Sequence, residues 1–206
     1  MPAKHPPKHR RKRPAKRPPY RLQEISDAQM TEPQRALRDA IFAGPRGVRS
    51  KLTGPFAIWL HAPQMGMLAQ ALGAHCRFKT ALPPRLSEFA ILVTAQHWRA
   101  QYEWFMHAPM AERAGVKPET IGDIKAGRAP KRAPADERAI YDFIRELYRT
   151  RRVSDRTYAR VRKFLTDAAM VELVGILGYY ALISMTLNVF NAQVPEEAEL
   201  PFREAA

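Results

Sequence analysis

The chain has 206 residues and a net charge of +14, from 34 Lys and Arg against 20 Asp and Glu. Its apolar and charged fractions, 46% and 26%, are those of an ordinary globular protein that can bury a core without disulfide bonds. Its one cysteine, Cys76, excludes an intramolecular disulfide framework and any CxxC redox or zinc-ribbon site.

The first 22 residues form a basic tail. They hold nine basic side chains, six of the 18 prolines and no acid. Such a segment cannot bury enough apolar surface to offset its ordering entropy, so we expect a disordered tail over 1–22 and one domain over 23–206. The tail could bind nucleic acid or an anionic membrane by neutralising phosphates, and a solvated tail without a partner is the alternative. No apolar stretch follows it, which excludes a secretory signal, and with the single cysteine we expect a cytoplasmic protein.

Proline, glycine and capping residues divide the rest of the chain into helices. The expected elements, in chain order, are a helix over 31–43, a short apolar segment from 54, and helices over 63–78, 85–108, 109–114, 118–126, 135–151, 154–165 and 167–190. No segment alternates with a period of two and β-branched enrichment, so we predict an all-α fold without a sheet.

The last predicted helix is apolar on all sides. Residues 173–187 form a 15-residue run without a charge, whereas a membrane span needs about 20 residues. A helix of this kind is typical of the centre of a bundle or of a subunit interface, so we expect no membrane span. Small residues recur every three positions at 175, 178, 181 and 184, and this spacing favours close packing in a homo-oligomer.

The segment 88–107 concentrates the chemically active side chains. Glu103 and His107 are four positions apart and share a helix face. Glu88 would lie about 28 Å from His107 on one straight helix, so the two can meet only if the chain turns near 99–102. An imidazole beside a carboxylate can move a proton near pH 7. A surface ion pair and ordinary aromatic packing are the alternatives.

Short motifs occur in a fixed order along the chain: GPF at 54–56, LHAP at 60–63, LPPRLSEFAILVTA at 82–95, HWRAQYEWFMH at 97–107, AGV at 114–116, ELVG at 172–175, GYY at 178–180, LNVF at 187–190 and VP at 194–195. Together they resemble the carboxymuconolactone decarboxylase family over about residues 31–195. The resemblance implies an all-α, alkylhydroperoxidase D-like helical bundle that assembles as a homo-oligomer, a trimer or a hexamer.

One branch of this family consists of thiol peroxidases, in which a glutamate precedes a CxxC motif and a histidine follows it. The resemblance places that glutamate on Glu88 and that histidine on His107, while the two cysteines fall on Ala100 and Glu103. The histidine between the cysteines falls on Tyr102. Peroxide reduction through CxxC needs a thiolate and a resolving thiol, and neither is present at these positions.

The resemblance therefore implies a cofactor-free lyase of aromatic compound catabolism that acts on a small carboxylated lactone or a related anionic substrate. Glu88 and His107 would form the acid/base pair, and Tyr102 would donate to a substrate oxygen. The side chains expected to bind substrate are His97, Trp98, Arg99, Glu103 and Trp104, with Arg85 or Arg99 holding a carboxylate. No histidine belongs to a metal-ligand motif, so we expect no metal. The alternatives are a peroxidase, disfavoured without CxxC, and a non-catalytic helical protein whose basic tail binds nucleic acid.

Overall fold

The computed structural model describes residues 17–47 and 50–203. Within these ranges the chain forms helices and no strands, which confirms the all-α prediction. The elements are the 3₁₀ helix η1 (Asp27–Gln29) and the helices α1 (Glu32–Ala43), α2 (Pro55–Trp59), α3 (Pro63–Phe78), α4 (Pro84–Trp98), α5 (Gln101–Arg113), α6 (Pro118–Lys125), α7 (Ala135–Thr150), α8 (Asp155–Val161) and α9 (Asp167–Val189).

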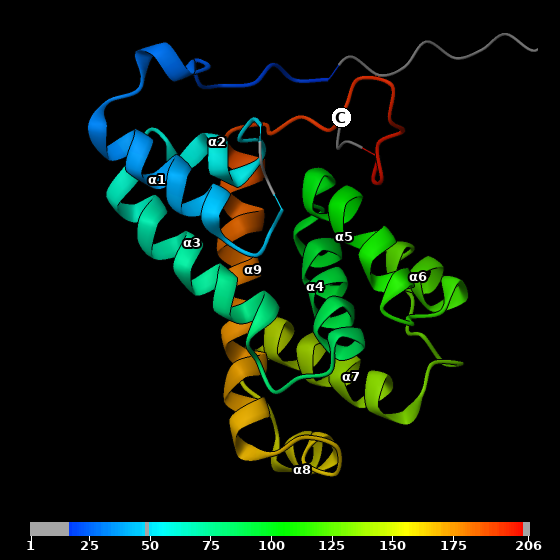
Figure 1. The fold of residues 1–206 in the computed structure, drawn as a ribbon. Helices are drawn as coiled ribbons and strands as arrows, with labels where there is room; N and C mark the ends of the chain where they lie inside the picture. Colours follow the sequence, from blue (N-terminus) through cyan, green and yellow to red (C-terminus); the bar gives the residue numbers. More distant parts are fainter. Residues whose placement is uncertain (1–16, 48–49, 204–206) are drawn as a thin grey trace, which may run out of the picture.

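Helix α9 runs through the middle of the molecule (Figure 1), and α2, α3, α4 and α5 pack against it. It is long and apolar enough to cross a membrane by length and composition. In this fold, however, ten of its side chains are buried against the surrounding helices, among them Leu173, Ile176 and Tyr180. The uniform apolarity that the sequence shows therefore reflects a central position in the bundle.

The long predicted helix over 85–108 is two helices, α4 and α5. Helix α4 ends because Arg99 adopts a left-handed backbone with φ 51°, and the Ala100 amide donates to the Ala95 carbonyl at 2.9 Å. This is the hydrogen-bond pattern of a helix C-terminus. Helix α5 then begins at Gln101 and packs against α4, so the turn expected near 99–102 is confirmed.

Two predicted helix boundaries are wrong. Pro109 lies inside α5 and does not begin a new helix over 109–114. Its ring removes one backbone donor, but burial of Trp104, His107 and Ala111 holds the helix across this position. Helix α8 ends at Val161, so Leu165 lies beyond it in the connection to α9.

The N-terminal segment from Arg17 to Gln23 lies along the segment that follows α9, and Figure 1 shows the two side by side in blue and red. The Arg21 amide donates to the Phe190 carbonyl at 3.2 Å, and the Arg17 guanidinium donates to the Val194 carbonyl at 3.0 Å. Residues 17–22, which the sequence pattern assigns to the basic tail, are thus attached to the domain. Residues 1–16 of that tail lie outside the described residues.

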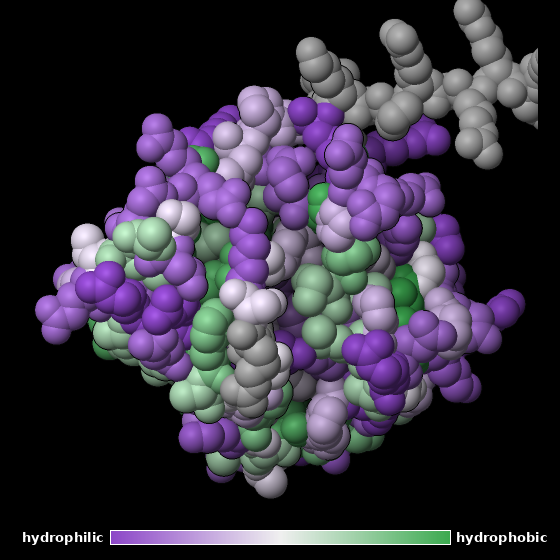
Figure 2. Space-filling model, turned by 45° about the horizontal axis from the view of Figure 1, so that its top comes forward, coloured by the Kyte–Doolittle hydropathy of each residue, from purple (hydrophilic) through white to green (hydrophobic). Residues whose placement is uncertain are grey.

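The surface of the bundle is mixed. In Figure 2, apolar side chains gather toward the middle of the face shown, and hydrophilic side chains surround them. Several large apolar side chains are exposed on α3 and α9, with Leu68 and Val171 each 73% exposed. The chain therefore leaves part of its apolar surface without a partner in the monomer.

Candidate active site

His107 lies between two carboxylates. Its Nδ1 donates to Glu88 Oε2 at 2.7 Å, and its Nε2 lies 3.0 Å from Glu103 Oε1. Glu88 comes from α4, while Glu103 and His107 are one turn apart on α5. The fold therefore joins the predicted Glu88–His107 pair. It also places Glu103, which the resemblance assigned to substrate binding, on the second nitrogen of the same imidazole.

The two carboxylates control the protonation of His107. Burial alone lowers the pKa of this imidazole, but Glu103 and Glu88 outweigh burial and raise its pKa to about 9. His107 is therefore an imidazolium at neutral pH, and both of its ring nitrogens act as donors. One imidazole and two carboxylates, all three buried, thus form a single cluster at this position.

Tyr180 covers one side of this cluster. Its ring meets the His107 ring edge-on, with centroids 5.2 Å apart. Burial, together with the nearby Glu103 and Glu88 carboxylates, raises the pKa of Tyr180 well above its ordinary value. The phenol therefore stays neutral and keeps its hydroxyl proton beside the cluster.

A pocket of about 160 Å³ opens onto His107 and Glu103. Two arginines line it, Arg46 from the loop after α1 and Arg77 from the last turn of α3. The remaining lining side chains are mainly apolar or aromatic: Thr53, Pro55, Phe56, Gly73, Tyr102, Met106, Met110, Tyr179, Tyr180 and Ile183. A small, largely apolar cavity with a few convergent polar groups is the usual form of a small-molecule site.

Arg46 is fixed in the wall of this pocket. Its guanidinium donates to the Gln70 carbonyl at 2.7 Å and lies 5.1 Å from the centroid of the Phe56 ring. Burial lowers the pKa of Arg46, and the nearby Tyr179 phenol opposes this effect. Arginine nevertheless remains charged in proteins, so Arg46 presents a partly desolvated cation to the cavity.

Two glycines let tyrosine side chains reach the pocket. A Cβ atom on Gly54, whose φ is +56°, would lie 2.4 Å from the Tyr102 ring, and one on Gly73 would lie 2.0 Å from the Tyr179 hydroxyl. Tyr102 is further held by a hydrogen bond of 2.8 Å between its hydroxyl and Thr53 Oγ1. The predicted Tyr102 therefore does line the same pocket as His107.

The fold does not bring four of the predicted substrate-binding residues to this pocket. His97 stacks on Tyr148 with ring centroids 4.4 Å apart, near the end of α4. Trp98 and Arg99 line a separate surface hollow, and Trp104 is buried against the Phe202 ring. His97 and Trp98 lie in the last turn of α4 and Arg99 at its C-terminus, whereas Trp104 lies on α5, so none of the four shares the pocket of Glu103 and His107.

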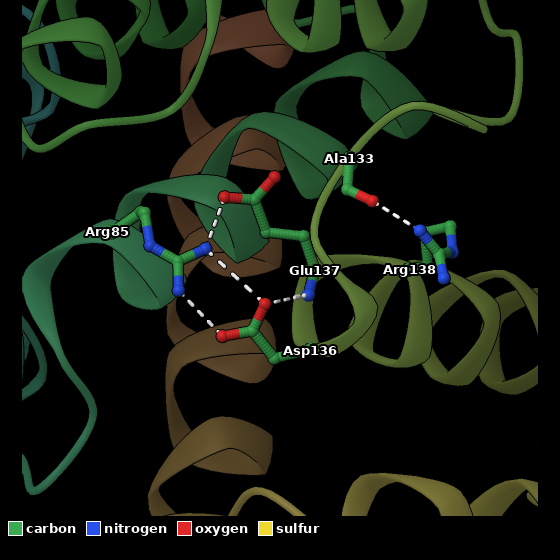
Figure 3. Close-up of polar contacts among 5 residues, drawn as sticks. All are labelled: Arg85, Ala133, Asp136, Glu137 and Arg138. Atoms are coloured by element: carbon green, nitrogen blue, oxygen red, sulfur yellow. Dashed lines mark hydrogen bonds and ion pairs between the residues drawn. The ribbon is translucent and has the colours of Figure 1, made fainter.

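The two arginines expected from the sequence to hold a carboxylate are already engaged. Arg85 pairs with Asp136 at 2.6 Å and with the buried Glu137, as Figure 3 shows. Arg99 donates to the Arg203 carbonyl and lies over the Phe202 ring. The positive charge at the His107 pocket comes instead from Arg46 and Arg77.

The lining residues that sequence reasoning missed include Arg46, Arg77, Tyr179 and Tyr180. Tyr179 and Tyr180 belong to the GYY motif of the family resemblance, and this motif was the one sequence feature that could have pointed to them. Arg46 stands in a Gly-Pro-Arg-Gly loop that indicated only a helix end. Among the described residues, no group of three or more His, Cys, Asp or Glu side chains is arranged to hold a metal ion.

Comparisons with known proteins agree with this architecture. Residues 63–146, which include Glu88, Glu103 and His107, match the model of the carboxymuconolactone decarboxylase family. A similar solved structure is the alkylhydroperoxidase AhpD core, an uncharacterized peroxidase-related protein from Ralstonia eutropha JMP134, with TM-score 0.73 and 17% identity over 88% of this chain and 95% of that chain. At this identity, the likeness shows the fold. No curated protein matches the chain.

The fold defines the chain as an AhpD-like, all-helical protein. The family-model match over residues 63–146, together with this fold, supports a carboxymuconolactone decarboxylase-family, AhpD-like protein.

Proposed function

We propose that this protein is a cofactor-free lyase that decarboxylates a small carboxylated lactone or a related anionic substrate. The observation that carries the proposal is the position of His107, held between Glu88 and Glu103 at 2.7 and 3.0 Å beside a pocket with two arginines. Arg46 and Arg77 supply positive charge for the substrate anion. The Glu88–His107–Glu103 cluster supplies a proton.

The reaction requires charge stabilisation and one proton. The bond between the carboxylate and the substrate carbon breaks, and its electron pair moves into a conjugated carbonyl to give an enolate while CO₂ leaves. An arginine beside the enolate oxygen stabilises the developing charge. A proton then forms the new C–H bond, so that one substrate carboxylate and one proton give the product and CO₂.

Glu103 is the group that delivers this proton in our proposal. Both ring nitrogens of His107 already face carboxylates. Glu103 Oε1 lies beside Nε2, at the place where a substrate would otherwise have to accept the Nε2 proton directly. The Nε2 proton passes to Glu103, which transfers it to carbon, and Glu88 holds the Nδ1 proton throughout. Solvent then restores the imidazolium.

A thiol peroxidase is not supported by the cysteine chemistry. Cys76, the one cysteine of the chain, is 2% exposed, and burial raises the pKa of its thiol. A buried, protonated thiol is a poor nucleophile. The position that aligns with a peroxidase cysteine carries Glu103, a proton donor and acceptor.

We also propose that copies of the chain associate through α3 and α9. These two helices pack together and expose Met65, Leu68, Leu72, Val171, Val174, Met185 and Val189. A Cβ atom on Gly175 or Gly178 would meet nothing within 4 Å in the monomer, which leaves room for a close helix. Light scattering should show an oligomer that Leu68→Glu dissociates, and a monomeric native chain would refute this assembly.

The function is tested by adding carboxymuconolactone to the full chain and following ultraviolet absorbance. We expect turnover by the native protein, a loss of about 100-fold or more in His107→Gln, and native turnover in Glu112→Gln, a matched change at an exposed position of α5. Native rates in His107→Gln would contradict the mechanism. A folded native protein without turnover on this and related carboxylated lactones would favour the non-catalytic alternative. The cytoplasmic location and nucleic-acid binding by residues 1–22 stay predictions.

A further inference from the structure

A second and larger cavity adjoins the His107 pocket. It measures about 310 Å³ and lies between the N-terminal segment, α1, α2 and the segment after α9. Its apolar lining includes Ile25, Met30, Phe42, Leu52, Ala57 and Leu60. We call this cavity the outer pocket and the His107 pocket the inner pocket.

The charged groups around the outer pocket are paired with each other. Lys51 forms an ion pair with Glu24, and Arg38 lies 3.3 Å from Asp27. Each cation therefore has an anion beside it, so these groups do not require a charge on a ligand. The apolar lining favours a hydrocarbon group instead, whereas Arg46 and Arg77 favour an anion in the inner pocket.

The linings of the two cavities meet at Thr53. Thr53 lines both of them, and its hydroxyl lies 2.8 Å from the Tyr102 hydroxyl, which faces the inner pocket. Gly54 lines the outer pocket and lies against the Tyr102 ring. Thr53 and Gly54 therefore place the Tyr102 side chain at the boundary between the two pockets.

The sizes of the two cavities favour a joint site. The inner pocket, about 160 Å³, is smaller than the 300 to 1,000 Å³, roughly, of most small-molecule sites. The outer pocket alone, about 310 Å³, lies at the lower end of that range, and the charged groups that line it within the described residues are paired with each other. Together the cavities offer one end that binds an anion and one apolar end.

We infer that the substrate is an amphipathic carboxylic acid whose acidic head lies beside Arg46 and Arg77 and whose alkyl or aryl tail fills the outer pocket. This inference rests on the proposed function for the inner pocket and adds the tail as a specificity element. Tyr102 lies at the boundary between the two pockets. A compact lactone without a tail would use only the inner pocket and would bind more weakly.

The test is a calorimetric binding series of straight-chain carboxylates, from butanoate to decanoate, on the full chain. We expect the affinity of the native protein to rise about two- to fourfold for each added methylene until the outer pocket is filled. In Ala57→Phe, which fills the outer pocket, butanoate should bind as before and the gain with chain length should disappear. Ala36→Phe, at an exposed position of α1, is the matched control and should behave as the native protein.

This experiment distinguishes the claim that the substrate has an apolar tail from the proposed function of the inner pocket. Arg46→Met should weaken every acid by a similar factor, because it alters the inner pocket alone. Binding of butanoate without any gain along the series, or a gain that persists in Ala57→Phe, would overturn the amphipathic substrate and leave the proposed function intact. Failure of all the acids to bind the native protein would also overturn the amphipathic substrate, whereas the proposed function is overturned only by the absence of turnover of carboxylated lactones. If Ala57→Phe does not fold, Ala192→Phe fills the same pocket from the segment after α9.

Discussion

His107 Nδ1 lies 2.7 Å from Glu88 Oε2, although the two residues are 19 positions apart in the chain. They meet because the left-handed backbone at Arg99 ends α4 and allows α5 to pack back against it. The site therefore depends on one backbone position as well as on its functional side chains. Substitutions at Arg99 should show how much the left-handed backbone of this turn affects the free energy of unfolding, apart from the chemistry of the Glu88–His107 pair.

Backbone strain at Arg99 predicts the order of stability among its variants. A φ of 51° is accessible to Gly but costly for a β-branched residue. Arg99→Val should lower the free energy of unfolding by about 1 to 3 kcal/mol relative to Arg99→Gly, as measured by urea denaturation. Equal stability of the two variants would show that the turn does not constrain this residue.

The raised pKa of His107 predicts that stability falls at alkaline pH. The folded protein binds this proton with a pKa of about 9, above the ordinary value of about 6.5 in the unfolded chain. The stabilisation from this group is therefore complete below about pH 6.5, decreases above it and is lost as the pH rises through about 9. The native protein should lose on the order of 3 kcal/mol across this window.

His107→Gln provides the comparison for this pH dependence. Because glutamine does not titrate, the unfolding free energy of the variant should vary less between about pH 6.5 and 9 than that of the native protein. Urea denaturation at several pH values measures the difference. Parallel pH profiles for the two proteins would place the stabilising proton elsewhere.

The contact between Gly73 and Tyr179 predicts opposite effects of two glycine-to-alanine changes. Alanine in a helix interior is favoured over glycine by about 1 kcal/mol, and Gly122→Ala in α6 should show this gain because its Cβ would meet nothing within 4 Å. At Gly73 the new Cβ would lie 2.0 Å from the Tyr179 hydroxyl. Gly73→Ala should therefore destabilise the protein despite its helix propensity, as thermal unfolding would show, and a stabilising effect would contradict the close approach of Tyr179 to Gly73.

Arg85 should contribute to stability and leave anion binding unchanged. It pairs with Asp136 and with Glu137, whose side chain is 1% exposed. Arg85→Met would leave a buried carboxylate without its cation, at a cost of about 3 to 5 kcal/mol in unfolding free energy. The folded variant should bind butanoate with the affinity of the native protein. A loss of butanoate affinity in the folded variant would show that Arg85 takes part in anion binding.

The helices could largely be predicted from local signals, since Pro63, Pro118 and Gly44 stand at helix ends as their chemistry requires. Pro109 was misinterpreted because burial of neighbouring side chains overrides the local preference of proline. The Glu88–His107 pair followed from the family resemblance, since spacing alone only required a turn.

The cationic wall of the inner pocket could not be predicted in the same way. Arg46 and Arg77 come from a loop and from the end of α3, and they reach the pocket only through tertiary packing. By contrast, Arg85 and Arg99 lie near Glu88 in the sequence but pair with other groups in the fold. The family resemblance therefore identified the buried acid/base pair, whereas sequence proximity misplaced the groups that surround it.

The most direct test of the relay is the single-turnover rate of carboxymuconolactone decarboxylation by Glu103→Gln, with Glu112→Gln as the control on the same helix. Glutamine keeps the size of the side chain and a hydrogen-bond acceptor for His107, but it cannot pass on a proton. The relay predicts a rate about 100- to 10,000-fold below that of the native protein, with substrate affinity nearly unchanged. A native single-turnover rate in Glu103→Gln would contradict it.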